Sequence, residues 1–377
     1  MEDAGAKFEG EQLRATVKIL KRVEPPITRK DLLSRPELSE LTILKQPRGT
    51  NYRLTNDEAK MLESLTSGQT SSTLKTVDLW SELANQTNLG SDELHEIESL
   101  LQAKKQIILE GPPGSGKTYV SELFARYFSG NTLDDSFQDN LLTVQFHQSY
   151  GYEDFIQGIR PKTNDRGELS YQVEPGVFKQ FCDKAQQDIK RPFVIVIDEI
   201  NRGNISKIFG ELLFLLEYRG KKISLPYDRS LFFIPSNIFI IGTMNTTDRS
   251  LAQIDYALRR RFYFYRLLPV INGRAPVLER ALQKLQVEES ACQRIVRLFI
   301  ALNDRVQERL GEHFQIGHSH FMLRNIGDDW ILRRVWNRSI LPLIEEYFYN
   351  ARDKGSVLSE FKIERLLNEE SEQIQNP

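Results

Sequence analysis

The sequence predicts an α/β fold: a parallel sheet flanked by helices, followed by a helical domain and preceded by a small α+β domain. Between residues 77 and 268, short apolar runs alternate with helical stretches, and the runs are "QIILE", "LLTVQF", "PFVIVI" and "NIFIIG". Such alternation is typical of parallel strands that helices bury on both faces. Beyond residue 268, apolar residues recur at spacings of three and four, which indicates helices. The length of 377 residues favours two or three structural units over one core.

The same patterns divide the chain into four segments. Residues 1–70 should form a small N-terminal domain, with a helix over roughly 11–23 and two short strands within "TILKQPRGTNYRLT". Helices followed by a basic hairpin resemble a DNA-binding winged helix, and a docking or packing module fits the pattern equally well. Residues 71–94 should form a linker and a first helix, 95–268 the large α/β domain, and 269–377 a helical lid domain with a disordered C-terminal tail.

Composition points to a cytoplasmic protein without membrane association. The formal net charge of -2 gives no whole-chain attraction to nucleic acid, so any such binding needs a local patch. Cys182 and Cys292 match no metal-ligand spacing and cannot form a disulfide framework, which favours a reducing compartment. The start, "MEDAGAKFEGE", lacks the features of a signal peptide, and no apolar run approaches the roughly 20 residues that span a bilayer.

The clearest functional signal is "GPPGSGKTY", which follows an apolar strand and opens a helix. Its spacing matches the phosphate-binding pattern G-x-x-x-x-G-K-T. Glycines let backbone N–H groups face phosphate oxygens, and the helix N-terminus adds a positive dipole end. Lys117 can reach the β- and γ-phosphates, and Thr118 can ligate Mg²⁺. The residues expected to bind the nucleotide are Gly111, Pro112, Pro113, Gly114, Ser115, Gly116, Lys117, Thr118 and Tyr119.

A second signal follows the apolar strand of "PFVIVIDEINRGN", which ends in Asp198 and Glu199. In an open α/β sheet, ligands bind at the carboxyl ends of the strands. Asp198 suits the shell of Mg²⁺, and Glu199 suits polarising a water that attacks the γ-phosphate. Alternatively, the acidic pair caps a helix that begins near Asn204.

The polar block "MNTTDRS" comes directly after the apolar run "NIFIIG". Buried polar groups need partners, so such a block is either a capped turn or part of a site. We expect this strand to lie beside the strand that ends at Asp198. Asn245 would then hold the attacking water, while Asp248 and Arg249 would orient the network or pass its state to a neighbour.

Three consecutive arginines, Arg259, Arg260 and Arg261, stand at the end of a predicted helix in "DYALRRRFYF". An arginine that reaches the phosphates from outside can raise the rate of phosphoryl transfer by roughly 10³- to 10⁵-fold. We expect at least one of the three to do so, with Arg259 and Arg260 as the candidates. Arg261 alternatively anchors the last strand.

Together these segments resemble the McrB-like AAA+ family, the nucleotide-hydrolysing subunits of modification-dependent (McrBC-type) restriction systems. The resemblance spans about residues 95–350. It rests on "GPPGSGKT", "VQFHQSYGYEDFIQGIRP", "DEINRGNISKIFGELLFLLE", "MNTTDRS", "DYALRRRF" and "QIGHSHF". It implies an AAA+ P-loop NTPase that uses GTP, or ATP, with Mg²⁺ and assembles as a homo-hexameric ring. It further implies an McrC-like nuclease subunit as partner and DNA, in some members modified, as substrate.

The resemblance also assigns roles to single residues. It makes Gly111 to Thr118 the Walker A loop, Asp198 and Glu199 the Walker B pair and Asn245 the first sensor. His318 falls in the lid segment that senses nucleotide, although a core histidine fits equally well. The segment from Ile159 to Pro175 resembles an inserted hairpin that faces a pore or a partner, or is a plain surface hairpin.

Two departures and three alternatives stay open. Thr247 stands where the family block usually has Ala, and residues 1–70 do not resemble the methylcytosine-reading domain of the best-known member, so its DNA target is not carried over. An ATP-dependent remodeller of the MoxR type carries the same loop. A nucleotide-gated DNA-binding scaffold is the second alternative, although intact Glu199 and Asn245 argue against an inactive site. A standalone regulator without a nuclease is the third.

Overall fold

The structure is a computed structural model that describes residues 7–9, 12–14, 79–131, 139–163, 167–247 and 256–367. The chain forms two compact units, Met1–Thr76 and Val77–Pro377. In the first, β1 (Lys7–Glu9) and β2 (Gln12–Arg14) pair antiparallel. The helix expected over 11–23 is therefore wrong at 12–14, because a short helical pattern alone stabilises a helix only weakly. The rest of the winged-helix prediction lies outside the described residues.

The second unit contains a parallel five-stranded sheet in the order β11-β3-β10-β7-β4. Its strands are β3 (Gln106–Gly111), β4 (Leu141–Gln145), β7 (Phe193–Asp198), β10 (Ile238–Asn245) and β11 (Tyr263–Arg266). The four apolar runs are thus confirmed as strands of one parallel sheet. β10 lies between β3 and β7, so the predicted neighbour relation of β10 and β7 is also confirmed.

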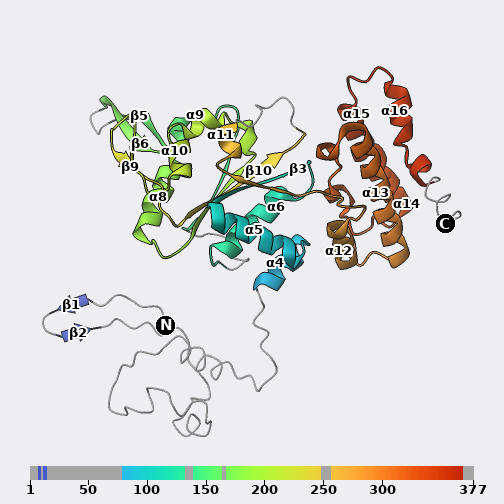
Figure 1. Ribbon diagram of the computed structural model, residues 1–377, viewed down its shortest axis with the longest axis horizontal. Helices are drawn as coiled ribbons and strands as arrows, with labels where there is room; N and C mark the ends of the chain where they lie inside the picture. The colour runs from blue at the N-terminus through green and yellow to red at the C-terminus, as the bar shows by residue number, and fades with distance from the viewer. Residues whose placement is uncertain are drawn as a thin grey trace, which may run out of the picture. The chain divides into compact units, whose positions relative to one another are not determined.

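Helices bury both faces of this sheet (Figure 1). Ile107 and Leu109 of β3 pack into a cluster with α4, α5 and α6, while Ile108, between them, packs into the cluster on the opposite face. This alternation follows from the two-residue repeat of a strand. The helices of this domain are α4 (Leu79–Thr87), α5 (Ser91–Lys104), α6 (Lys117–Phe128), α7 (Tyr152–Phe155), α8 (Val177–Gln187), α9 (Ile205–Phe209), α10 (Leu212–Glu217) and α11 (Tyr256–Arg259), with a 3-10 turn η2 (Ile200–Arg202).

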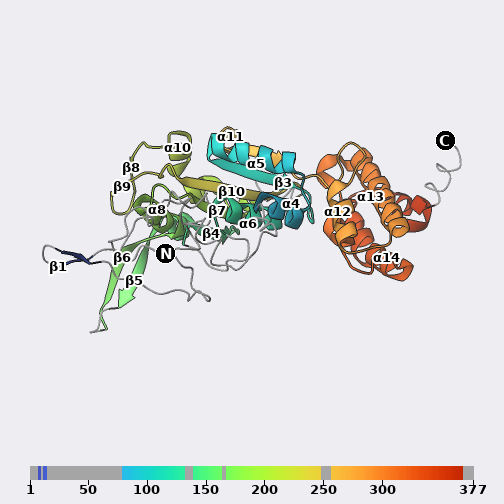
Figure 2. The same ribbon diagram turned by 90° about the horizontal axis from the view of Figure 1, so that it is seen from below.

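A helical domain follows β11 and has its own core around the buried Trp336, whose Nε1 donates a hydrogen bond of 2.8 Å to the carbonyl of Phe361. Figure 2 shows α12, α13 and α14 gathered together in this domain. Its elements are α12 (Pro276–Lys284), α13 (Glu289–Leu310), η3 (Glu312–Phe314), η4 (His318–Phe321), α14 (Asp329–Val335), η5 (Trp336–Ile340), α15 (Leu341–Tyr347) and α16 (Lys354–Glu360). The predicted helical character of this region is therefore confirmed.

Two hairpins leave the large domain. β5 (Gln157–Thr163) and β6 (Leu169–Pro175) pair antiparallel, as the inserted hairpin was expected to do, and β8 (Ile223–Ser224) pairs with β9 (Leu231–Phe232). A role of the first hairpin towards a pore or partner stays a prediction.

Across the described ranges, none of the helices has the length and apolar character that crossing a membrane requires.

Candidate nucleotide-binding site

The segment from Gly111 to Thr118, here called the phosphate loop, connects β3 to α6 at the carboxyl edge of the sheet. Gly114 and Gly116 have φ of 77° and 81°, a left-handed conformation that favours glycine. At Gly111, a Cβ atom would lie 2.5 Å from the carbonyl oxygen of Leu267, so no side chain fits there. The three glycines are therefore required by the backbone itself, and the loop takes the shape that its sequence predicts.

Lys117 begins α6 and is buried against its own loop. Its Nζ donates a hydrogen bond of 2.7 Å to the carbonyl of Pro112, and Ser115 Oγ donates one of 2.9 Å to the same oxygen. The positive charge thus lies within the loop, next to the α6 N-terminus, where both favour an anion. Tyr119, by contrast, is about half exposed and lines a neighbouring cavity.

A chain of hydrogen bonds joins this loop to the ends of β7 and β10. Thr118 Oγ1 donates to Asp198 Oδ1 over 2.8 Å, and Thr243 Oγ1 donates to the same oxygen over 2.6 Å. The backbone N–H of Glu199 in turn donates to Thr243 Oγ1 over 3.0 Å. Thr243 is only 1% exposed. Sequence reasoning missed it, although a hydroxyl in an otherwise apolar strand is a detectable signal.

Thr118 and Asp198 fit a Mg²⁺ site. Their side-chain oxygens approach to 2.8 Å, one from the start of α6 and the other from the end of β7. Mg²⁺ prefers oxygen ligands and usually takes one or two from the protein, with the rest from phosphates and water. One hydroxyl and one carboxylate beside a phosphate loop provide that donor set.

Glu199 has φ of 52°, an uncommon conformation for a residue with a side chain and one that concentrates at functional sites. Its carboxylate forms an ion pair of 2.8 Å with Arg202, and Gln145 Nε2 lies 3.5 Å from carboxylate oxygens of both Glu199 and Asp198. The capping alternative is wrong, because the side chain of Asn204 itself caps α9 by accepting from Lys207 N. The sequence alone does not identify Arg202 or Gln145 as site residues.

Asn245 ends β10 opposite Gly111 of the phosphate loop. Its carbonyl accepts a hydrogen bond of 3.4 Å from Asn201 Nδ2, and the next residue, Thr246, donates its N–H to Gly111 O over 3.1 Å. The polar block therefore starts beside the loop, as its position in the sequence predicts. Asp248 and Arg249 lie outside the described residues.

The three arginines are not at this edge of the sheet. The carbonyl of Arg261 accepts a hydrogen bond of 2.8 Å from Gln106 at the opposite end of β3. That strand has six residues, so its ends are roughly 17 Å apart. Arg261 is buried, with a side chain 9% exposed and 3.3 Å from Glu217, which agrees with its role as an anchor. Arg260 is 64% exposed, and Arg259 is exposed with its guanidinium over the ring of Phe264.

The helical domain contacts the phosphate loop directly. Ser319 N donates to Gly114 O over 3.1 Å, and a Cβ on Gly317 would lie 2.2 Å from the Gly114 carbonyl carbon. His318, between them, is 6% exposed, and its Nδ1 has no hydrogen-bond partner among the described residues. Burial, together with the charge of Lys117, lowers the pKa of His318 to about 4. The imidazole beside the loop is therefore neutral near pH 7.

This shift predicts a specific loss of stability in acid. In the unfolded chain His318 takes up a proton near pH 6.5, whereas in the folded chain it does so only near pH 4. The free energy of unfolding is therefore highest above pH 6.5 and decreases as the pH falls from 6.5 towards 4. Between pH 7 and pH 5 the expected loss is about 2 kcal/mol. Urea unfolding of the wild type and of His318→Gln at both values measures it. Equal losses in the two proteins would contradict the assignment.

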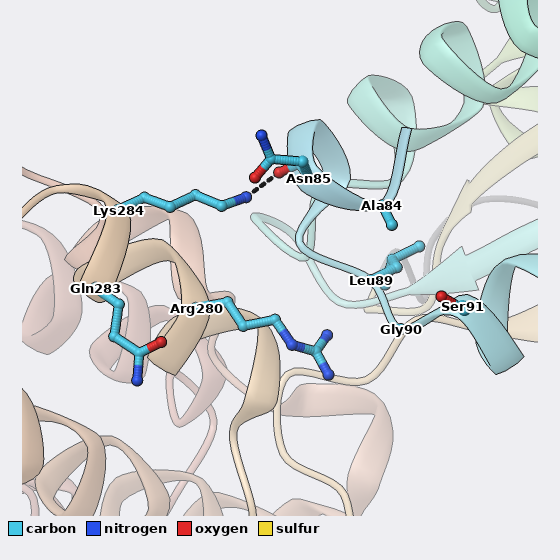
Figure 3. Close-up of a pocket in the computed structure, with 8 residues that line it drawn as sticks. All are labelled: Ala84, Asn85, Leu89, Gly90, Ser91, Arg280, Gln283 and Lys284. Carbon is cyan, nitrogen blue, oxygen red and sulfur yellow. Dashed lines mark hydrogen bonds between the residues drawn. The ribbon is translucent and has the colours of Figure 1, made fainter. Parts of the chain in front are cut away.

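A cavity of about 190 Å³ adjoins the loop, between the α4–α5 connection and the helical domain. The helical domain also contacts the opposite side of the α4–α5 connection, where Arg280 and Lys284 of α12 point towards it (Figure 3). Arg280 Nη1 donates to Asn88 O over 2.6 Å, and Lys284 donates to the carbonyl of Asn85. The residues that line the cavity are Thr87, Asn88, Leu89, Glu93, Ser115, Gly116, Tyr119, Val120, Leu267, Leu268, Ile271, Pro276, Val277, His318, Ser319 and Met322.

A phosphate loop at the carboxyl edge of this parallel sheet, with a helical lid against it, defines an AAA+ protein of the P-loop NTPase class. Residues 106–262 match the family "AAA domain (dynein-related subfamily)". Residues 294–355 match "McrB, alpha-helical lid domain". Over these two domains the chain is an McrB-like AAA+ protein, as the resemblance implied.

Two relatives carry names from restriction systems. The "Type IV methyl-directed restriction enzyme EcoKMcrB subunit" of Escherichia coli K12 is 39% identical over 271 residues, which cover 67% of this chain and 57% of that protein. The "Type II restriction enzyme BsuMI component YdiS" of Bacillus subtilis 168 is 27% identical over 196 residues, or 42% of this chain and 55% of that protein. The chain thus spans a little over half the length of each.

Proposed function

We propose that this chain is the GTP-hydrolysing AAA+ motor subunit of an McrBC-like restriction system, which drives DNA translocation and cleavage together with a separate McrC-like nuclease subunit. The names of both relatives and the McrB-type lid support the restriction system. The observation that carries hydrolysis is the hydrogen-bond chain from Thr118 through Asp198 and Thr243 to Glu199. It holds the phosphate loop and the acidic pair in one site.

Each part of this site has a defined task in hydrolysis. The loop from Gly111 to Thr118 binds the phosphates through its backbone N–H groups and Lys117. Thr118 and Asp198 hold Mg²⁺, which when bound neutralises charge on the phosphates. Glu199 accepts the proton of the attacking water, and Asn245, next to Gly111, orients that water.

The site needs a second copy to be complete. Arg259 and Arg260 are exposed and lie at the opposite end of β3 from their own phosphate loop. In a ring they would reach the phosphates of a neighbouring subunit, so we propose a homo-hexamer with the nucleotide between subunits.

The protein would act in the cytoplasm on DNA, in some cases modified. Residues 1–70 would contact the DNA or dock a partner.

Phosphate release by the full chain with GTP and ATP side by side tests this proposal. We expect faster release from GTP and none from Lys117→Ala, because that variant lacks the charge within the loop. Faster release from ATP would favour a remodelling ATPase of the MoxR type instead. Binding of nucleotide without hydrolysis of either would favour a nucleotide-gated DNA-binding scaffold.

A further inference from the structure

The cavity beside the phosphate loop has the size and lining to hold a base. Pockets for drug-sized ligands are roughly 300–1,000 Å³, so its volume of about 190 Å³ suits a part of a ligand. Ser115 and Gly116 of the loop are among the residues that line it. Most of its wall is apolar, which suits the faces of a flat ring; the apolar lining residues are Leu89, Val120, Leu267, Leu268, Ile271, Pro276, Val277 and Met322.

Glu93, on α5, brings a carboxylate to this wall. Its Oε2 accepts a hydrogen bond of 2.7 Å from the N–H of Gly90, which fixes the side chain at the start of the helix. Its Oε1 accepts none from the part of the chain that the structure describes. An ionised carboxylate is an acceptor only, with about four acceptor positions on two oxygens. Glu93 therefore offers the cavity acceptors and no donor.

Asn88, in the α4–α5 connection, offers a donor. Its Oδ1 accepts a hydrogen bond of 2.5 Å from Lys284 Nζ, so the amide oxygen must face the lysine. Its Nδ2 donates to none of the described residues. The other polar group of this connection, the Thr87 hydroxyl, donates to Leu83 O and accepts from Leu89 N. Of the polar residues in the wall, Glu93 therefore offers acceptors and Asn88 an oriented donor; the others, besides Thr87, are Ser115, Tyr119, His318 and Ser319.

This pair complements guanine better than adenine. Guanine carries an acceptor at O6 beside two donors, N1–H and the N2 amino group, whereas adenine carries a donor at N6 beside an acceptor at N1. We infer that Glu93 accepts from N1–H and N2 of guanine while Asn88 donates to O6, so that these residues determine base specificity. Adenine offers the carboxylate a single donor group, its N6 amino group, so it forms one hydrogen bond fewer with Glu93. The inference rests on the proposed GTPase function.

Glu93→Gln tests this inference with little change in shape. Glutamine can also serve at this position of the helix start, so the bond from Gly90 is kept, while an amide donor replaces the free carboxylate oxygen. We expect the preference for mant-GDP over mant-ADP to fall roughly 10- to 100-fold, mainly through weaker GDP binding. Glu96→Gln, exposed on the same helix, should keep the wild-type ratio. An unchanged ratio in Glu93→Gln would overturn the inference and leave the GTPase proposal standing.

A change in the ligand gives a second test, whose main comparison uses the wild-type chain alone. Inosine diphosphate lacks the N2 amino group of GDP and is otherwise the same. The wild-type chain should bind it roughly tenfold more weakly than GDP, and Glu93→Gln should bind both alike. Equal binding by the wild type would overturn the contact between Glu93 and N2. A wild-type preference for mant-ADP would instead overturn the guanine preference of the proposed function itself.

Discussion

Replacing Glu199 by glutamine should lower the rate of nucleotide hydrolysis roughly 10²- to 10⁴-fold and leave nucleotide binding almost unchanged. Glutamine has the shape of glutamate but cannot accept a proton from water at neutral pH. The backbone N–H of Glu199 still donates to Thr243, so the turn after β7 is preserved. The ion pair with Arg202 is lost. The expected defect is therefore one of chemistry.

Phosphate release at saturating GTP measures the rate, and titration with mant-GDP measures binding. Glu122→Gln is the matched control, because Glu122 lies on α6 outside the cavity lining and outside the hydrogen-bond chain. It should keep both values. Hydrolysis at the wild-type rate in Glu199→Gln would show that another group activates the water, and would leave Glu199 the structural role of pairing with Arg202.

The fold could be predicted where the signal is local. Strands buried on both faces are apolar at most positions, so β3 and β7 can be recognised from their own sequences, "QIILEG" and "FVIVID". The helical lid is visible for the same reason, because its period of three and four lies within each helix. The helix expected over 11–23 is wrong at 12–14, where the chain pairs as a strand with residues 7–9 instead.

The site could be predicted only where one segment supplies a whole function. The phosphate loop and the acidic pair are contiguous, and the end of β10 follows from the rule for strand ends. Thr243 could be suspected as a hydroxyl in an otherwise apolar strand. Gln145 and Arg202 act through contacts with other strands and turns, which their own positions in the sequence do not reveal. The cavity wall is harder still to predict, since it brings together residues from distant parts of the chain, such as Glu93 and Met322.

Removing the exposed arginines should have an even larger effect than removing Glu199. We expect Arg259→Ala or Arg260→Ala to lower the rate roughly 10³- to 10⁵-fold, the range for an arginine that stabilises charge in phosphoryl transfer. Arg261→Ala should instead destabilise the fold, because that side chain is buried beside Glu217. Phosphate release and thermal melting of the three variants separate these effects. Full activity in both Arg259→Ala and Arg260→Ala would contradict the assignment.

Mixing inactive subunits tests whether the arginine acts on a neighbour. Lys117→Ala lacks a working loop but keeps its arginines, and the affected arginine variant has the converse defect. Where the two meet in a ring, an intact loop can face an intact arginine, since the arginines lie at the opposite end of β3 from their own loop. Each variant alone should be inactive, and an equal mixture should recover part of the wild-type rate. If the two variants co-assemble and no activity returns, the arginines act within their own chain.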